Sequence, residues 1–284
     1  MANMRAIRTR IKSVESTRQI TKSMKMVAAS KLRKTQDSMA ALRPFAETSR
    51  KMLAHVAQSA SGAESPLLRQ RGGEKICYVL LVGNRGLCGM YNSALVKYLE
   101  NLAKGQDCFL VVSGRWGREV IAAAGIPVKK TFAAASDTPD SAEARRLAGY
   151  LRELYLNGEA DKVVLVYQHY KSALAQIPVN MQLLPVVADE PDESAAGDYI
   201  FEPDAAELLD RLAELYLDST MLSVLLEAKT GEHTARMTAM TSATDNTEEL
   251  LDELRLRLNH ARQSAITTEI SEIAGGAAAL NNNK

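Results

Sequence analysis

The sequence predicts an α/β fold with long helices, in which the N- and C-terminal helices pair as an antiparallel coiled coil and an α/β domain is inserted between them. From about residue 205 to the end, the chain has no proline, and Gly231 is the only glycine before Gly275. From about residue 4 to 60 it has one proline, Pro44, and no glycine. Between these stretches, short apolar runs alternate with glycine turns and helical patterns, which is typical of a βαβ arrangement.

The N-terminal stretch carries an apolar stripe with the 4-3 spacing of a coiled-coil seam. Starting at Ile7 and ending at Val56, about ten of the fifteen seam positions are apolar. Pro44 should kink or loosen the helix locally. The sequence therefore predicts one long helix from about Met4 to Ala60, with its apolar stripe turned toward a partner helix.

Charge is unevenly distributed in this first helix, because residues 1–36 contain ten Lys or Arg and one acid, Glu15. Three interpretations are open: a solvated face, a docking face for an acidic protein surface, or a patch for nucleic acid or anionic lipid. No aromatic residues interleave the basic ones. Their absence weakens the single-stranded nucleic-acid interpretation, which depends on aromatic stacking.

The inserted segment follows a Ser/Gly/Pro linker over residues 61–73 and reads as a Rossmann-like domain with a mainly parallel sheet. Four core strands are expected at Ile76–Val82, Cys108–Val112, Lys162–Tyr167 and Ile177–Val187, the last interrupted at Pro185, with an edge strand at Val128–Phe132. Helices are expected at Tyr91–Leu102, Arg118–Ala124 and Ser141–Asn157. Ser141 is the expected N-cap of the last helix. The predicted division is 1–60 for the first coiled-coil helix, 74–190 for the α/β domain and 204–284 for the second coiled-coil helix.

The C-terminal stretch of roughly 75 residues far exceeds the mean helix of about 11 to 12 residues. A pattern of this length indicates a coiled coil or a long free-standing helix. Small residues at 235, 239, 242 and 243 predict a slim segment, and leucines between 250 and 258 predict a thicker apolar belt. After Glu272 the end is nearly uncharged. It is interpreted either as a fraying helix end or as an end that sits in an apolar sleeve.

Composition narrows the class of protein. The 284 residues carry a net charge of +1 and are 46% hydrophobic, which excludes a disordered chain. No apolar run is long enough to cross a membrane, and the N-terminus has no signal-peptide core. The three cysteines form no metal or redox motif, so a reduced, cytosolic setting is expected. His233 and His260 are expected to be exposed on the last helix. We expect no metal site, no cofactor and no catalysis by this chain alone.

The turn Gly83–Gly89 between a strand and a helix is the strongest indication of an enzyme. A glycine-rich turn that opens a helix can hold a phosphate. However, the sequence GNRGLCG matches neither GxGxxG nor GxxxxGK[ST]. The alternative is a tight turn whose glycines allow the helix to pack close to the sheet.

Three blocks of the sequence resemble the γ subunit of F-type ATP synthases. They are MKMVAASKLRKTQ at 24–36, GNRGLCGMYN at 83–92, and 235–279 with its ending ITTEISEIAGGAA. The resemblance runs over essentially the whole chain. The second block differs from the usual S-D-R-G-L-C-G-G-[YF]-N at Gly83, Asn84 and Met90.

This resemblance implies the central rotor shaft of the F1 motor, a non-catalytic subunit that binds no nucleotide and takes part in regulating ATPase activity. The coiled coil would stand inside the hexamer of alpha and beta subunits. The α/β domain would lie at the foot with the epsilon subunit, against the c-ring of the membrane sector. Proton flow would then drive ATP synthesis by rotation. The implied location is the cytoplasmic face of the bacterial inner membrane, as a peripheral protein.

The resemblance also implies contact residues. Arg262 and Gln263 match shaft residues that hydrogen-bond a catch loop of the beta subunit. Glu202 matches a foot segment that meets the c-ring loops. The basic N-terminal helix would face an acidic lever of the beta subunit. The positions that match a cluster across the coiled coil are Met24, Lys25, Thr267 and Glu269.

Two other classes of function are alternatives to the rotor. A small α/β enzyme with helical arms would use the Gly83–Gly89 turn for phosphate, and nucleotide titration would detect its ligand. A coiled-coil nucleic-acid adaptor would use the basic first helix, and its affinity would fall steeply with salt.

Overall fold

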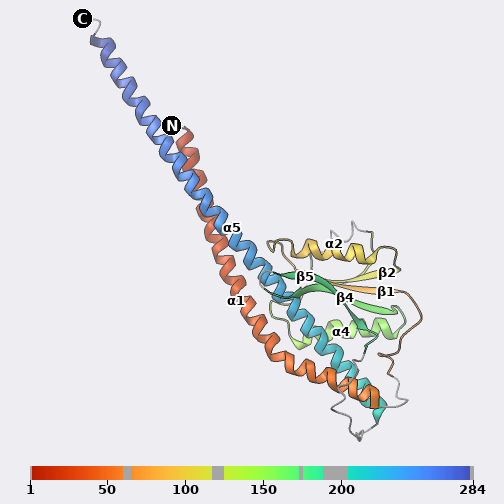
Figure 1. The fold of residues 1–284 in the computed structure, drawn as a ribbon. Coiled ribbons are helices and arrows are strands. Elements are labelled where there is room, and N and C mark those ends of the chain that lie inside the picture. The colour runs from red at the N-terminus through yellow and green to blue at the C-terminus, as the bar shows by residue number, and fades with distance from the viewer. Residues whose placement is uncertain (1, 60–64, 117–124, 173–174, 188–203, 282–284) are drawn as a thin grey trace. The chain divides into compact units, whose positions relative to one another are not determined.

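The structure is a computed structural model that describes residues 2–59, 65–116, 125–172, 175–187 and 204–281. The described elements are α1 (Ala2–Ser59), β1 (Ile76–Leu81), α2 (Tyr91–Ala103), β2 (Cys108–Ser113), β3 (Val128–Phe132), α4 (Ser141–Leu156), β4 (Lys162–Tyr170), β5 (Gln176–Leu184) and α5 (Ala205–Asn281) (Figure 1). The chain divides into two compact units. Unit 1 comprises residues 1–27 and 237–284, and unit 2 comprises residues 28–236. The two long helices contribute residues to both units.

Unit 2 contains a five-stranded mixed sheet in the order β3-β2-β1-β4-β5. The first four strands in this order are parallel, with β1 in register with β2 from Ile76↔Cys108 to Leu81↔Ser113. Strand β5 is antiparallel to β4. Only five residues separate Tyr170 from Gln176, whereas a parallel return needs a crossover of about a dozen residues or more. The expected α/β fold with long terminal helices is confirmed.

Helices cover both faces of this sheet, as Figure 1 shows for α2 and α4. Because side chains alternate along a strand, β1 feeds two cores. Tyr78 and Leu80 pack toward α2, while Cys77, Val79 and Leu81 belong to the core that includes α4, the end of α1 and the first part of α5. Both faces of β1 are therefore buried, which explains why its sequence ICYVLL is a continuous apolar run.

The N-terminus of α4 differs from expectation at its cap. Asp140, not Ser141, is the N-cap: its side chain accepts a hydrogen bond from the Glu143 N–H, and the Glu143 carboxylate accepts one from the Asp140 N–H. This reciprocal capping box favours Asp140, since it satisfies two backbone donors that the helix itself leaves free.

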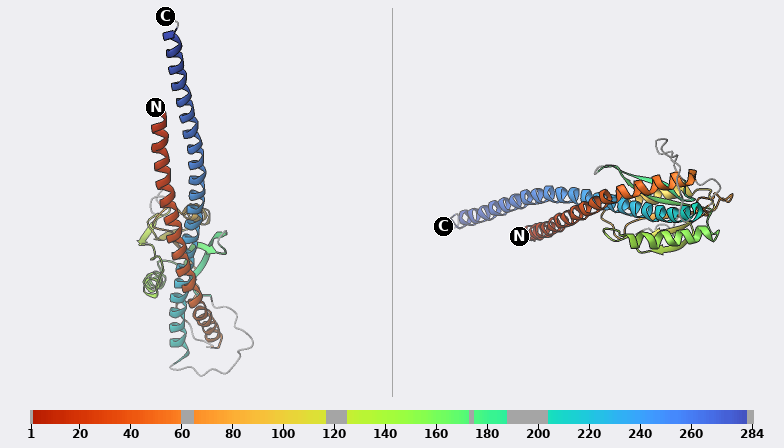
Figure 2. Two further views of the ribbon diagram at one scale, coloured as in Figure 1. Left: turned by 90° about the vertical axis from the view of Figure 1, so that its left-hand side faces the viewer. Right: turned by 90° about the horizontal axis from the view of Figure 1, so that it is seen from below.

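Unit 1 is an antiparallel pair of helices. The hydroxyls of Thr21 and Thr244 lie 2.9 Å apart, and Arg18 pairs with Glu248. Further toward the N-terminus, Glu15 pairs with Arg255. In these three pairs the residue number decreases along α1 while it increases along α5, so the two helices are antiparallel. Figures 1 and 2 show that α5 continues past the N-terminal end of α1.

The remaining sequence-based expectations have different outcomes. The helix predicted at Arg118–Ala124 falls outside the described residues. The strand predicted at Ile177–Val187 ends at Leu184, before the cis Leu184–Pro185 bond. The division at 1–60, 74–190 and 204–284 stays a prediction. No helix within the described ranges is long and apolar enough to span a lipid bilayer.

Candidate functional site

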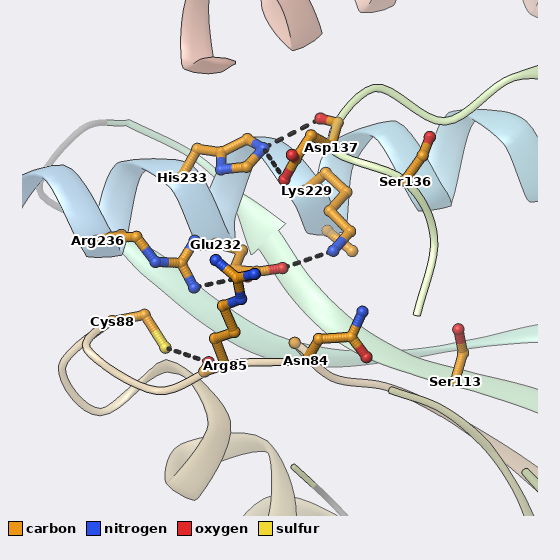
Figure 3. A network of polar contacts seen from close by, with 12 residues as sticks. Asn84, Arg85, Cys88, Ser113, Ser136, Asp137, Lys229, Glu232, His233 and Arg236 are labelled. Atoms are coloured by element: carbon orange, nitrogen blue, oxygen red, sulfur yellow. Dashed lines mark hydrogen bonds and ion pairs between the residues drawn. The ribbon is translucent and has the colours of Figure 1, made fainter. Parts of the chain in front are cut away.

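A buried cluster of charged residues on α5 meets loops at the carboxyl ends of the parallel strands. We call this cluster the clamp and define it as Lys229, Glu232, His233 and Arg236 of α5 together with Gly83–Gly89 and Asp137. All of its members belong to unit 2. Figure 3 shows the α5 residues lying between the loop that follows β1 and the loop that carries Asp137.

Glu232 is the centre of the clamp, with only 5% of its surface exposed. Lys229 Nζ lies 2.8 Å from its Oε2, and Arg236 Nη2 lies 2.7 Å from its Oε1. Burial alone raises the pKa of the Glu232 carboxyl, but the ion pairs and hydrogen bonds with Lys229 and Arg236 outweigh burial and lower the pKa overall. The carboxylate is therefore ionised and accepts from both partners.

The Gly83–Gly89 turn is shaped to receive this carboxylate. A Cβ added to Gly83 would lie 2.9 Å from Glu232 Oε1, so a side chain there would require the carboxylate to shift. The Gly83 N–H donates to Asn92 Oδ1 at 3.0 Å, and Arg236 donates to the Gly86 carbonyl at 3.5 Å. Since an acidic side chain occupies the space beside the first glycine, this turn does not favour a phosphate.

Asn84 stands where the resembled family usually has Asp. Its Oδ1 accepts a hydrogen bond from the Arg115 N–H at 3.3 Å. An amide oxygen and a carboxylate oxygen can both accept such a bond. The exchange of Asp for Asn at this position therefore keeps the contact between the two glycine turns that follow β1 and β2.

His233 is buried, which corrects the expectation that it is exposed. Only 1% of its surface is accessible, and its Nε2 lies 3.0 Å from the Asp137 carbonyl oxygen. Because a carbonyl only accepts, Nε2 carries the proton, and the buried Nδ1 has no hydrogen-bond partner in the structure. Burial lowers the pKa of His233 more than its neighbours raise it. The ring is therefore held neutral.

Asp137 links this side of the clamp to α1. Lys31 Nζ lies 2.6 Å from Asp137 Oδ2. Burial raises the pKa of the Asp137 carboxyl, but the hydrogen bond and charge of Lys31 lower it more. One loop residue thus contacts α1 through its side chain and α5 through its backbone.

The start of α2 and the end of β4 hold the preceding turn of α5. The Tyr91 hydroxyl donates to the Ala228 carbonyl at 2.8 Å, and Gln168 Nε2 donates to the Tyr91 carbonyl at 3.3 Å. The Tyr170 N–H donates to Glu227 Oε1 at 3.1 Å. A Cβ on Gly231 would lie 3.4 Å from the Tyr91 ring. Gly231, the first glycine of this helix, therefore sits where α5 passes close to an aromatic ring.

These contacts place α5 at the position where open α/β sheets usually bind ligands, the crevice outside the carboxyl ends of the strands. A cavity lined by residues that include Val82, Tyr91 and Glu232 has a volume of about 10 Å³, which is room for about one water molecule. The helix itself fills the usual ligand position. Among the described residues, no group of three or more His, Cys, Asp or Glu could hold a metal ion.

Six of the seven contact residues implied by resemblance lie elsewhere, in unit 1. Arg262, Gln263, Thr267 and Glu269 are exposed within about two turns of α5, while Met24 and Lys25 are half-buried on α1. Because Thr21 faces Thr244, the structure does not bring Met24 and Thr267 together. The 23 residues from Thr244 to Thr267 correspond to roughly 35 Å of helix. Glu202 lies outside the described residues. The contact roles themselves stay predictions.

The end of α5 also presents an apolar face. Ile266, Ile270 and Ile273 are 47%, 61% and 69% exposed. Their spacing of four and three residues places them on one side of the helix. They lie in the segment that continues toward and past the end of α1, where an external apolar surface could cover them.

Sequence reasoning missed the clamp. Its charges stand at i, i+3 and i+7, which reads as an ordinary solvated face. The signal that could have identified it is Gly231, because an isolated glycine inside a long helix usually has a packing reason. Lys229 and Glu232 lie on either side of that glycine. A helix that packs closely at the glycine therefore also buries these two charged side chains.

The chain matches the family model described as ATP synthase over residues 3–280. It is 43% identical over 282 residues to the ATP synthase gamma chain of Desulfitobacterium hafniense, covering 99% of this chain and 100% of that relative. It is 37% identical to the ATP synthase gamma chain of Chlorobium limicola, with the same coverage.

Solved structures share the fold. A chain of the Euglena gracilis mitochondrial ATP synthase OSCP/F1/c-ring matches with a TM-score of 0.72 at 20% identity, covering 100% of this chain and 96% of that one. A chain of the Tetrahymena thermophila mitochondrial ATP synthase central stalk and c-ring matches with a TM-score of 0.63 at 24% identity, covering 79% and 99%.

Proposed function

This chain belongs to the family of ATP synthase gamma chains, and from that membership we infer that it is the central rotor subunit of the F1 part of a proton-translocating ATP synthase. It is a non-catalytic subunit. It couples proton flow through the membrane sector to ATP synthesis at the alpha and beta sites by rotating, and takes part in regulating ATPase activity.

The observation that carries this function is the makeup of unit 1. Two antiparallel helices bury few large apolar residues between them, among them Met240, Leu251 and Leu254. The exposed isoleucines near the end of α5 form an apolar face that the described part of the chain leaves open. A slim helix pair with such an end suits the axle of a surrounding hexamer, which would cover that end.

The charges of unit 1 suit rotation. The pair Arg18–Glu248 spans 3.9 Å and is partly exposed, and Arg255 lies 3.5 Å from Glu15. Exposed ion pairs contribute about 0 to 1 kcal/mol each. If the contacts to surrounding subunits are of the same exposed kind, no single one holds the rotor at one angle, and the basic face of α1 can pass successive acidic levers of the beta subunits.

The remaining assignments refine this function. The partners are the alpha and beta subunits around the shaft, with the epsilon subunit and the c-ring at the foot. Glu202 is proposed to meet the c-ring loops, and Met24, Lys25, Thr267 and Glu269 to face the beta subunits. Hydrogen ion transport then takes place in the membrane sector, and the chain is a peripheral protein on the cytoplasmic face of the bacterial inner membrane.

The test of the function is assembly followed by coupling. The tagged full-length chain should co-purify with alpha, beta and epsilon subunits, and the complex reconstituted with its membrane sector should pump protons on addition of ATP. A chain that folds but neither joins the other subunits nor supports pumping contradicts the rotor assignment.

The contact roles of Arg262 and Gln263 have a separate test. Replacing both by alanine should weaken ATP-driven proton pumping while the chain stays folded, because both side chains are exposed and support no packing. Arg211→Ala, also exposed on α5, is the control and should pump normally. Undiminished pumping by the double variant would remove the proposed catch-loop contact.

A further inference from the structure

We propose that the clamp is a torque joint, in which Glu232, bound to Lys229 and Arg236 and seated against Gly83, fixes the rotational setting of α5 in the α/β domain. The α/β domain and this stretch of α5 then turn as one body. The inference rests on the proposed rotor function, and it adds a positioning residue that acts through the fold instead of through a partner subunit.

A joint is needed because apolar contacts are non-directional. A helix held on a sheet only by its apolar stripe can roll or slide when a load is applied along the chain. Hydrogen bonds and ion pairs weaken steeply when their geometry changes. The directional contacts in unit 2 therefore decide how well the setting of α5 is held against such a load.

The clamp engages α5 from two directions. Successive helix residues point about 100° apart. Glu232 points toward the turn after β1, while its neighbour His233 points toward the backbone of Asp137 (Figure 3). Arg236, one turn further on, reaches the Gly86 carbonyl. Contacts on two sides of a helix oppose rotation about its axis, which one contact alone would allow.

The buried charges of the clamp are better suited to fixing the orientation of α5 than to stabilising the folded protein. Glu232 and Lys229 are 5% and 7% exposed, so both have lost most of their hydration. Replacing a buried ion pair by well-packed apolar residues is often neutral or stabilising, and buried ionic groups are best attested as devices that fix a register. Gly83 completes the arrangement, since the absence of a Cβ leaves room for the carboxylate.

The matched exposed pair is Arg43–Glu47 on α1. It has the same i, i+4 separation as Glu232–Arg236 and a nearly equal distance of 2.8 Å, but both of its side chains are exposed. It joins residues of one helix and contacts no loop in its ion pair. It therefore serves as the control for removing one charge from an intrahelical pair.

The experiment compares Glu232→Gln with Glu47→Gln in the complete reconstituted complex. Two rates are measured on the same membranes: ATP hydrolysis and ATP-driven proton uptake. A slipping joint leaves hydrolysis near the wild-type rate and lowers proton uptake, so the ratio of protons moved to ATP hydrolysed falls. Glu47→Gln should leave both rates unchanged.

A second variant keeps the proposal testable if Glu232→Gln assembles poorly. Arg236→Gln removes the contacts to Glu232 and Gly86 but leaves the Lys229–Glu232 pair in place. It should show the same split between the two rates, with a smaller loss of proton uptake. Unchanged uptake in both variants, or hydrolysis and uptake falling in equal proportion, overturns the joint. Failure of the wild-type chain itself to couple would instead overturn the proposed function.

Discussion

Helices α1 and α5 contribute to both units, and they use charge differently in each. In unit 2, Glu232 and Arg236 lie 2.7 Å apart with 7% and 14% of their side chains exposed. In unit 1, Arg18 and Glu248 lie 3.9 Å apart with 40% and 57% exposed. Helix α5 therefore carries a short buried ion pair in unit 2 and is joined to α1 by a longer exposed ion pair in unit 1.

Apolar packing follows the same division. In unit 2 the first part of α5 joins a core that also draws on α1, α4 and the sheet. In unit 1 the same helix packs against α1 alone, and large residues such as Leu256 and Ile270 stay exposed. Removing a single contact should therefore change the free energy of unfolding by different amounts in the two units. Trp116 fluorescence reports on unit 2, and helical circular dichroism is used for unit 1.

The largest expected effect is on the clamp. Glu232→Ala leaves Lys229 and Arg236 without their buried counter-ion, and breaking a buried pair in this way costs about 3 to 5 kcal/mol. The single tryptophan, Trp116, packs on the α2 side of the core, and its backbone N–H donates to the Gly83 carbonyl, so its fluorescence reports unfolding of unit 2. In urea unfolding followed by Trp116 fluorescence, Glu232→Ala should lower the midpoint. Glu47→Ala should leave the midpoint unchanged. Equal urea midpoints for the two variants would show that the buried pair stabilises unit 2 no more than the exposed pair does.

A core deletion in unit 1 should have the next largest effect. Leu254 is 4% exposed, and Leu→Ala in a core costs about 2 to 5 kcal/mol; we expect the lower end because a two-helix interface can partly close around the gap. Loss of helical circular dichroism should shift to lower urea, with the Trp116 transition unmoved. The control is Leu256→Ala, at an exposed position two residues away. A matching shift at Trp116 would mean that the two units unfold together.

A smaller effect should appear with pH. Burial lowers the pKa of His233 in the folded protein, so below about pH 6.5 the unfolded chain binds more protons and stability falls as pH falls. The urea midpoint should therefore decrease as the pH falls from about 6.5 to 5. The pKa of Glu232 is also lowered, so its contribution is lost only below its ordinary value, at more acidic pH. His233→Gln should reduce the dependence of the free energy of unfolding on pH between pH 6.5 and 5, measured by Trp116 fluorescence. An unchanged dependence would show that other groups cause it.

The smallest expected effect is at the exposed pair of unit 1. Glu248→Gln should change the free energy of unfolding by less than about 1 kcal/mol, because water and salt screen the attraction between Glu248 and Arg18. The measurement is helical circular dichroism in urea at low and high salt. A larger, salt-independent loss would show that this pair is held as firmly as the clamp.

Most of the fold follows from local patterns in the sequence. The strand Val128–Phe132 was predicted with its observed bounds, and the glycine-free and nearly glycine-free stretches mark the two long helices. The antiparallel direction of β5 was missed because apolar runs are alike in both directions. Only the five-residue connection after Tyr170 carries the information. Asp140 was missed as a cap for a similar reason, since a neighbouring serine is an equally good candidate from sequence alone.

The site was less predictable than the fold. His233 and Glu232 occupy a stretch that local periodicity assigns to an exposed face, and only tertiary contacts with Asp137 and Gly83 bury them. Resemblance placed Met24 and Thr267 in one cluster, but the register set by Thr21 and Thr244 separates them. Long-range register is a property of the whole helix pair, and no local motif specifies it.

The position of α5 at the carboxyl ends of the strands limits how the α/β domain can be exchanged between relatives. The segment 65–187 by itself lacks the helix that supplies the acceptor for Tyr91 and the carboxylate beside Gly83. A chimera that receives only segment 65–187 from a relative combines the loops of one parent with the α5 helix of the other. Such chimeras should fold poorly. Grafts that carry residues 225–236 along with this segment should be tolerated, so the smallest transplantable piece of this molecule is discontinuous in sequence.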